Sequence, residues 1–314
     1  MRISSLALPI IIMMVLFGSP ARAALECPIF TLGETIEDCP WADITRALSH
    51  TQNIAAEFAK LPGVTKELEK DHGEKFLKTL WGDSINYDEG AKAIIVQPQI
   101  LDYLTSKLGV PARKDKIVHA GLEHTYGYLF SNLKTPFGYK RARWVRDDIE
   151  KGFRLPRGTL GPYAQKGSFF SNVTVFLSQI AFRTEADLAK EALEKSSRVS
   201  MAVFGFDFKR LGIKRIEETV EMHSRKVVLR TDLVSFLVKG LPTDNSHLLV
   251  YSYLDSDKST PLLITAFPVN QAFVDQVLKP ENFGHNLPVT TRYNAQINGI
   301  TGVTPPLLGT REIK

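Results

Sequence analysis

The spacing of apolar residues changes once along the chain, and this change constrains the fold more than any other feature. Residues 41–133 carry apolar side chains at helical spacing, whereas from Arg198 onward apolar and polar residues alternate as they do in strands. Helices that precede strands, instead of alternating with them, are typical of α+β proteins with antiparallel sheets. We therefore predict an α+β fold, with a helical N-terminal part followed by a predominantly antiparallel β-sheet C-terminal part.

Four segments carry helical patterns. Three of them lie in the N-terminal part, over residues 41–60, 64–81 and 114–133. In the third, apolar residues recur every three or four positions, which is the spacing of one helix face. The fourth covers residues 184–197, where Thr184 is a suitable N-cap and Glu185 lies in the first turn.

Alternating patterns predict the strands of the C-terminal part. They occur over residues 202–208, 247–254, 262–269 and 289–297. The second and third segments are separated by a short polar stretch, which is typical of a hairpin loop. We expect these two segments to pair as neighbouring antiparallel strands.

The start of the chain has the parts of a secretory signal peptide. Arg2 precedes an apolar run over residues 6–17, and small residues, Ala21 and Ala23, then occupy the −3 and −1 positions. A membrane-spanning helix needs about 20 apolar residues, so this run is too short to be an anchor. The sequence predicts export to the periplasm or the outside after cleavage between Ala23 and Ala24.

The two cysteines, Cys27 and Cys39, lie just after the predicted cleavage site. In an exported protein an even pair of cysteines predicts a disulfide, and two cysteines alone cannot build a structural zinc site. A free nucleophilic or metal-binding thiol is the alternative interpretation. Glu26 directly before Cys27 excludes a lipid anchor, because the lipidation signal requires a small residue there. No second long apolar run occurs, so we expect no transmembrane segment in the mature chain.

Changes in composition divide the chain into four predicted regions. They are the signal peptide (1–23), a disulfide-stapled helical region (24–133), a basic aromatic connecting region (134–171) and a region with a helix and an antiparallel sheet (172–314). The connecting region is rich in glycine and proline, which interrupt long helices and strands. Removing the signal peptide takes away two arginines, so the mature chain has a net charge of +3.

Several well-known catalytic motifs are missing from the sequence. It contains no Gly-x-Ser-x-Gly motif of α/β-hydrolases and no His-Glu-x-x-His zinc motif. Residues 161–168 resemble a phosphate loop only superficially, because the order at its end is Lys-Gly-Ser. An exported protein would also lack access to ATP. We therefore expect neither a cofactor nor a metal ion.

The densest cluster of acid–base residues is His119, Glu123 and His124. On a helix, His119 and Glu123 share a face and could form a hydrogen-bonded pair, in which the carboxylate orients a catalytic imidazole. His124 lies about 140° around the helix from His119, which argues against a zinc site with two histidines. A surface ion pair beside the apolar stripe is the alternative interpretation.

A second acidic cluster contains Glu217, Glu218, Glu221 and His223. On a strand, Glu217, Glu221 and His223 would point to the same side and could bind a hard cation. On a helix, Glu217 and Glu221 would share a face without His223. A solvated acidic face explains the same pattern, and it is the commoner arrangement.

The connecting region interleaves cations with aromatic rings, a pattern that suits contact with phosphates together with stacking on bases or other rings. The candidate binding residues are Lys140, Arg141, Arg143, Trp144, Arg154 and Arg157. A solvated basic loop whose aromatic residues pack on the core is the alternative interpretation. The expected partners of a binding surface here are an anionic polymer or a membrane surface.

A further candidate catalytic group lies in the predicted sheet. His247 shares a strand face with Tyr251 and Tyr253, and Arg292 lies on the polar face of the last predicted strand. A histidine, a cation and a phenol could cleave a phosphoester by acid–base catalysis without a metal ion. A polar outer sheet face is the alternative interpretation.

Two functional hypotheses follow from these residues. In the first, the protein is an exported, metal-independent hydrolase of an anionic polymer or phosphoester, with His119 or His247 as acid or base and Arg292 stabilising the developing charge. In the second, it is a non-catalytic binding protein that holds a polyanion, a lipid headgroup or another partner through residues 134–170.

Overall fold

The computed structural model describes most of the chain from Trp41 onward. The described residues are 41–88, 91–113, 115–127, 129–135, 138–139, 148–155, 160, 169–188, 198–201, 206–209, 212–222, 224–236, 245–255, 257–277, 295–296 and 307–313. The predicted signal peptide and the Cys27–Cys39 disulfide lie outside these residues. None of the helices in the described ranges is both long enough and apolar enough to cross a membrane.

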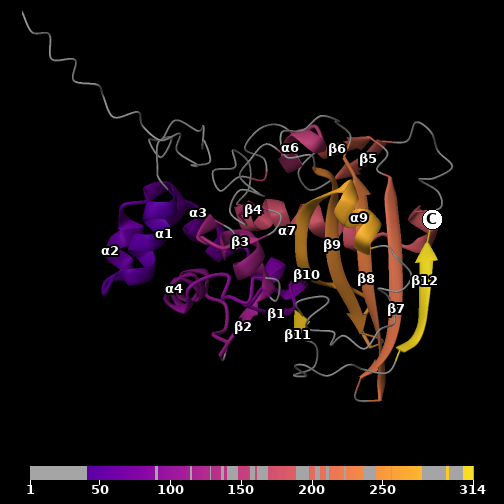
Figure 1. Ribbon diagram of the computed structural model, residues 1–314, viewed down its shortest axis with the longest axis horizontal. Helices are drawn as coiled ribbons and strands as arrows, with labels where there is room; N and C mark the ends of the chain where they lie inside the picture. The colour runs from indigo at the N-terminus through magenta and orange to yellow at the C-terminus, as the bar shows by residue number, and fades with distance from the viewer. Residues whose placement is uncertain are drawn as a thin grey trace, which may run out of the picture.

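The predicted α+β order is confirmed, with helices in the N-terminal half and an antiparallel sheet in the C-terminal half (Figure 1). The helices are α1 (Trp41–His50), α2 (Ile54–Ala59), α3 (Pro62–Gly73), η1 (Lys75–Leu80), α4 (Pro98–Leu108), η2 (Leu122–Gly127), α6 (Asp148–Gly152), α7 (Phe169–Ala181) and α9 (Gln271–Val277). Two short hairpins accompany them, β3 (Lys134–Thr135) with β4 (Gly138–Tyr139) and β5 (Arg198–Met201) with β6 (Phe206–Lys209).

The main sheet of the described chain has five strands in the order β10-β9-β8-β7-β12, and all neighbouring strands are antiparallel. Its strands are β7 (Ile213–Met222), β8 (Arg225–Ser235), β9 (Asn245–Asp255), β10 (Leu262–Asn270) and β12 (Leu307–Ile313). The predicted pairing of residues 247–254 with 262–269 is confirmed by β9 and β10. The β7–β8 hairpin was not predicted, although residues 217–223 were considered as a strand.

The helical half is joined to the β10 edge of the sheet through the backbone. Trp81 bridges Leu263 in parallel, and the Gly82 N–H donates to the Leu263 carbonyl at 2.8 Å. A Cβ atom at Gly82 would lie 2.7 Å from the Ile264 side chain and 3.0 Å from the Tyr253 ring, so glycine permits this close approach. The chain continues from Gly82 into β1 (Asp83–Ile85), which pairs with β2 (Ile117–His119) and with β11 (Ala295–Gln296).

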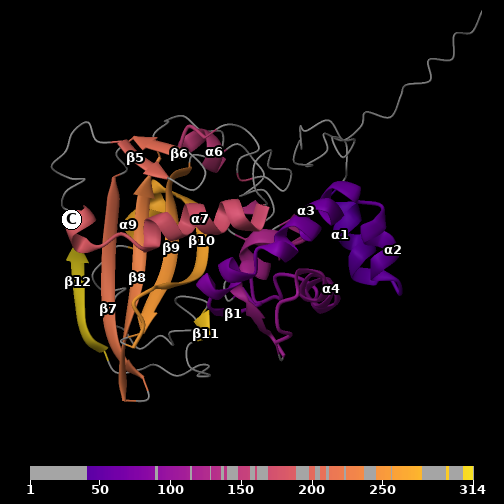
Figure 2. The ribbon, with the colours of Figure 1, turned by 180° about the vertical axis from the view of Figure 1, so that it is seen from behind.

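Helix α7 lies across one face of the sheet and extends into the helical half (Figure 2). It contacts α3, η1 and η2 on one side and β8, β9 and β10 on the other. Residues of α7 share one core with residues of both halves, including Val173 and Phe176 of α7, Leu101 of α4 and Val250 of β9. The core therefore runs through α7 from one half of the described chain to the other.

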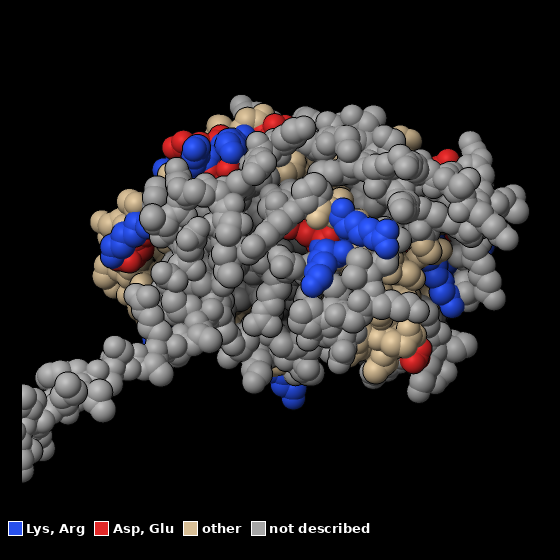
Figure 3. All heavy atoms as spheres, turned by 90° about the horizontal axis from the view of Figure 1, so that it is seen from above, with Lys and Arg blue, Asp and Glu red and all other residues tan. Residues whose placement is uncertain are grey.

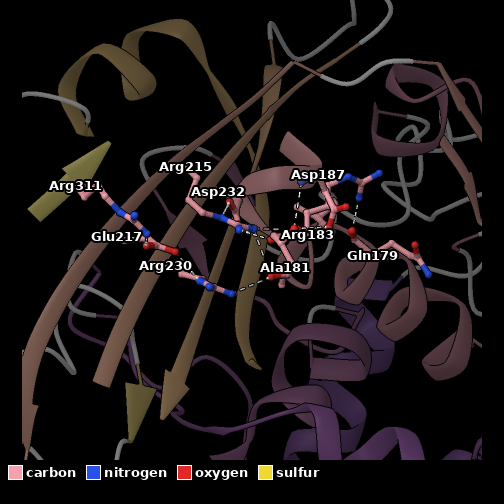
Figure 4. A network of polar contacts seen from close by, with 11 residues as sticks. Gln179, Ala181, Arg183, Asp187, Arg215, Glu217, Arg230, Asp232 and Arg311 are labelled. Atoms are coloured by element: carbon pink, nitrogen blue, oxygen red, sulfur yellow. Dashed lines mark hydrogen bonds and ion pairs between the residues drawn. The ribbon is translucent and has the colours of Figure 1, made fainter. Parts of the chain in front are cut away.

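Both ends of α7 are capped by charged side chains from other elements. At its N-terminus, the Phe170 N–H donates to the two carboxylate oxygens of Asp71 at 3.0 and 3.1 Å. At its C-terminus, the Arg215 guanidinium donates to the carbonyls of Ile180, Ala181 and Arg183 (Figure 4). A negative charge at the N-terminus and a positive charge at the C-terminus both complement the helix dipole.

Arg215 is itself buried, and its charge is balanced by Asp232. The Arg215 Nε lies 2.7 Å from the Asp232 Oδ1, and both side chains are inaccessible to solvent. These residues face each other in the β7–β8 register, so the strand pairing places the carboxylate beside the guanidinium. A buried ion pair with further hydrogen bonds of this kind is costly to break from one side, because the other charge stays buried.

The predicted helix over residues 114–133 is wrong in its first part. Ile117–His119 form β2, and helical structure begins only at Ala120, continuing as the π-helical turn η2. Pairing with β1, in which His119 faces Asp83, overrides the helical spacing of the apolar residues.

Other boundaries differ for local reasons. The predicted helix over 41–60 is broken into α1 and α2, because the Asn53 side chain caps the Ala56 N–H at 3.1 Å and starts a new helix. Thr184 is an N-cap as predicted, since its hydroxyl accepts from the Asp187 N–H at 3.1 Å. Helices α4 and α7 were not predicted; α7 is buried on nearly all sides, including its polar residues Ser171, Asn172, Thr174 and Ser178, so it has no exposed polar face.

We expect Arg215→Met to lower the free energy of unfolding by about 3–5 kcal/mol, because it leaves Asp232 buried without its partner and removes the cap of α7. Urea unfolding followed by circular dichroism measures this change. The control is Lys60→Met, which removes an exposed ion pair with Glu57 and should cost less than about 1 kcal/mol. Equal losses in the two variants would contradict the capping role.

Candidate functional site

His119, the first candidate catalytic residue, lies at the end of β2 and is 3% exposed. Its Nε2 donates to the Lys78 carbonyl at 2.6 Å, which fixes the neutral ring with the acceptor at Nδ1. Burial, together with the nearby charges of Arg113 and Lys78, lowers the pKa of His119 to about 4, against the hydrogen bond to the Lys78 carbonyl. Within the described residues the Nδ1 atom has no hydrogen-bond partner.

The predicted pair between His119 and Glu123 does not form. Because His119 belongs to a strand, the two residues do not lie one helical turn apart, and the imidazole bonds the backbone of Lys78 instead. The Glu123 carboxylate, which is fully buried, accepts a hydrogen bond from the Ser84 hydroxyl of β1. Its other oxygen lies 3.7 Å from the Nε2 of His124, the neighbouring residue on η2.

His124 connects this carboxylate to the main sheet. Its Nδ1 lies 2.9 Å from the Thr265 hydroxyl of β10. Ser84, Glu123, His124 and Thr265, which we call the junction array, therefore link β1, η2 and β10. Both Thr265 and His124 come from irregular backbone, since β10 changes register at Leu263/Thr265 and η2 is a π-helix.

The junction array has the order of groups found in some nucleophilic sites, namely hydroxyl, imidazole and carboxylate. Its four members are, however, at most 4% exposed. A substrate cannot reach side chains that are buried to this degree without movement of η2 or β10. In this structure the array satisfies buried polar groups where the two halves meet.

Three other titratable groups lie at the edge of this junction. Asp83 is partly exposed and forms an ion pair with Arg113 at 2.9 Å. Burial raises the pKa of Asp83, while the charge of Arg113 opposes this shift. Burial, with the nearby charges of Asp83 and Asp255, raises the pKa of Tyr253 to about 12, so the phenol stays protonated at neutral pH.

His247, the second candidate base, lies far from the junction. It lies near the start of β9, six residues before Tyr253 on the same strand. Tyr253 lies beside Gly82 at the junction, and six residues of a strand span about 20 Å. The side chain is half-buried, and its Nδ1 lies 2.8 Å from the Ser246 hydroxyl. Burial lowers the pKa of His247, against the charge of Asp275. His119 and His247 thus do not share a site, and Arg292 lies outside the described residues.

Glu217, Glu218 and Glu221 lie on a strand, β7, as one of the two interpretations predicted, and Glu217 is paired with two arginines. Glu217 bonds Arg230 at 2.9 Å and Arg311 of β12 at 2.5 Å (Figure 4). Burial would raise the pKa of Glu217, but its hydrogen bonds and the charges of the two arginines hold it below its usual value. Among the described residues, no group of three or more His, Cys, Asp or Glu could hold a metal ion. His223 lies outside those residues.

Most of the candidate binding residues, namely Lys140, Arg141, Arg143, Trp144 and Arg157, lie outside the described residues. Arg154 is described, and it follows α6 in the left-handed backbone region with φ of 55°. Its side chain is exposed, whereas the preceding Phe153 is buried against the rings of Phe176 and Phe236 at centroid distances of 5.2 and 5.1 Å. In this stretch the aromatic ring belongs to the core and the cation faces solvent.

Comparison of the chain with protein-family models finds no match, and the same is true of comparisons with curated proteins and with solved structures.

Several residues that organise the site were not identified from the sequence. Asp71 lies among other charged residues, in the stretch Glu-Lys-Asp-His-Gly-Glu-Lys, and nothing in that stretch marks it as buried. Thr265 lies in an apolar strand pattern, where a threonine is ordinary. His124 was noted only as a residue that diverges from His119. A charged residue without an apolar neighbourhood gives no periodic signal of burial.

We expect the buried His119 to make the folded protein less stable at acidic pH. As the pH falls below 6.5, the unfolded chain takes up a proton that the folded imidazole, with its pKa near 4, does not accept. Stability therefore falls between pH 6.5 and 4, on the order of 3 kcal/mol in total. In His119→Gln, which keeps a donor for the Lys78 carbonyl, urea midpoints should depend less on pH in this range.

The matched control is His50→Gln, which changes an exposed histidine on α1. It should leave the pH dependence of the wild type in place. A His119→Gln variant with the same pH dependence as the wild type would show that the buried imidazole is not responsible.

Proposed function

We propose that the protein is an exported, non-catalytic binding protein that holds an anionic ligand with phosphate groups through its basic region, residues 134–171. The ligand is a soluble polyphosphate-like polymer or the headgroups of an anionic membrane, which share the same chemistry. The exposed Arg154 beside the buried Phe153 carries this proposal, because it shows a cation presented to solvent by an anchored backbone.

The distribution of charge supports the proposal. The basic region contains nine lysines and arginines but three acidic residues, a net charge of +6, whereas the whole chain carries +5. Without the predicted signal peptide, the mature chain carries +3, so its remaining residues carry −3. On the face seen in Figure 3, described lysines and arginines lie mostly beside acidic side chains. A local excess of positive charge attracts polyanions and raises their association rate.

The described part of the basic region is anchored by apolar side chains. Ile149, Phe153, Leu160 and Phe170 are at most 1% exposed. Lys151 and Arg154, which lie between these anchors, are exposed. An anchored backbone reduces the entropy that cationic side chains lose on binding. The rings of Phe153 and Phe170 are buried, whereas Lys151 and Arg154 are exposed, so this part of the region offers ionic contacts.

A metal-independent hydrolase is the second candidate function, and the contact between Thr265 and His124 favours it. Burial of the junction array and of His119 argues against it. The test is the hydrolysis of bis-p-nitrophenyl phosphate and p-nitrophenyl acetate in the presence of EDTA. We expect no turnover above buffer. Turnover that is lost in Thr265→Val, His119→Ala or His247→Ala would establish the hydrolase instead.

We predict that binding to inorganic polyphosphate weakens steeply with salt, because each phosphate contact adds about 0.7–0.9 to the slope of log Kd against log salt concentration. Reversing three cations of the region, with Arg141, Arg143 and Arg154 changed to Glu, should weaken binding at least tenfold. Fluorescence anisotropy with labelled polyphosphate measures both effects. Vesicles of phosphatidylglycerol and phosphatidylcholine test the membrane source in the same buffer.

The matched control reverses the charge of three exposed lysines outside the basic region, by changing Lys66, Lys226 and Lys258 to Glu. It makes the same change in net charge and should weaken binding less than threefold. Equal losses in the two triple variants would assign binding to overall charge and not to the basic region. Binding of the wild type that persists in 1 M NaCl would contradict an electrostatic site.

A further inference from the structure

We propose that protonation of His119 opens the junction between the two halves of the described chain while the main sheet stays folded. The junction consists of the contact between η2 and α7 and the contact between β1 and the β10 edge. This acid-sensitive device goes beyond the proposed binding function and does not depend on it.

Only one nitrogen of the buried imidazole has a hydrogen-bond partner among the described residues. The Nε2–H donates to the Lys78 carbonyl at 2.6 Å, whereas Nδ1 is without a partner there. A Cβ atom at Gly121 would lie 3.1 Å from Nδ1 and 2.6 Å from the Phe170 ring. The Nδ1 atom therefore lies beside the Gly121 backbone, where the helical segment that includes η2 packs against the start of α7.

A proton on Nδ1 would make this atom a charged donor without an acceptor in the described part of the chain. Such a group is costly to keep buried, because it has lost its water and gained no partner. Separation of Gly121 from the Phe170 ring would bring water to Nδ1. We therefore expect the protonated ring to open the contact between η2 and α7.

The charged side chains around His119 do not compensate for this cost. Lys78 and Arg113 act on the imidazole with positive charges and, together with burial, lower its pKa to about 4. Asp83 is the partner of His119 in the β1–β2 register, but its carboxylate forms an ion pair with Arg113 at 2.9 Å. Protonation of His119 thus adds a positive charge beside two others.

The titratable groups of η2 are bonded to other elements. The Glu123 carboxylate accepts from the Ser84 hydroxyl, and the Nδ1 of His124 lies 2.9 Å from the Thr265 hydroxyl. Helix α7, on the other side of the imidazole, carries no charged residue. Movement of the surrounding elements, and not a local counter-charge, is therefore how the structure accommodates a second proton on the ring.

The backbone next to His119 connects this movement to the main sheet. The Ala120 N–H donates to the Gly82 carbonyl at 2.9 Å, and the Gly82 N–H donates to the Leu263 carbonyl of β10 at 2.8 Å. Displacement of His119 and Ala120 therefore acts on the hydrogen bond that holds β1 to the β10 edge.

The other strands of the sheet do not depend on this edge. Strands β8 and β7 are the third and fourth strands counted from β10, and they pair with each other over ten residues. The buried ion pair between Arg215 and Asp232 joins them independently of His119. We therefore expect the β7–β8 hairpin to stay closed when the junction opens.

Amide hydrogen exchange at pH 7.5 and pH 5 tests the proposal, with each rate divided by that of an unfolded chain at the same pH. The segments compared are 78–86 and 117–127 at the junction and the β7–β8 hairpin. An open junction binds a proton with the usual pKa of 6.5, and the closed one only near 4. Protection at the junction should therefore fall on the order of 25-fold from pH 7.5 to pH 5, to a value below that of the hairpin.

The test variant is His119→Gln, which keeps a donor for the Lys78 carbonyl and cannot be protonated. Its protection at the junction should change less than about threefold between the two pH values. The matched control is His247→Gln, which removes another histidine whose pKa is lowered by burial, at the far end of β9. It should show the wild-type loss of protection at the junction.

Three results would overturn the proposal. The first is equal protection of the junction and the hairpin at pH 5, which would show that acid acts only through global unfolding. The second is a wild-type loss of protection in His119→Gln. The third serves if this variant does not fold: an imidazole of His119 that titrates above pH 6 in the folded wild type, measured by NMR of the histidine rings. Titration near pH 4 with the proton on Nε2 would support the proposal.

Discussion

The capping of α7 by two buried charges is the interaction on which the rest of the structure depends. Asp71 of α3 binds the N-terminus of this helix, and Arg215 of β7 binds its C-terminus. The helix carries no charge of its own and is buried between both halves, so its terminal backbone groups have no access to water. Each half supplies the charge that satisfies one end of the helix.

The need of buried polar groups for hydrogen-bond partners also explains why the acid–base residues do not form an open site. His119, Glu123 and His124 lie where the helical half meets the β10 edge, and each is bonded to backbone or side chains of another element. Groups buried at such a junction must find partners inside the protein. In the described structure these polar groups join the two halves.

Patterns that depend on neighbouring residues were predicted well. The order of helices and strands, the β9–β10 hairpin and the N-cap at Thr184 all follow from local spacing and capping preferences. The strand at Ile117–His119 was missed because its pairing with Asp83–Ile85 joins segments more than thirty residues apart. The predicted His119–Glu123 pair failed for the same reason, since it assumed a helix where a distant strand imposed an extended backbone.

The amino-acid sequence alone was sufficient to identify the α+β class and the concentration of cations over residues 134–171, because spacing and charge are properties of consecutive residues. Only the tertiary structure shows which charged side chains are buried and paired inside the protein. Asp71, Glu150, Arg215 and Asp232 look like ordinary surface residues in the sequence, yet they are buried and paired across the fold. Burial and pairing depend on segments that meet only after folding, so no local pattern records them.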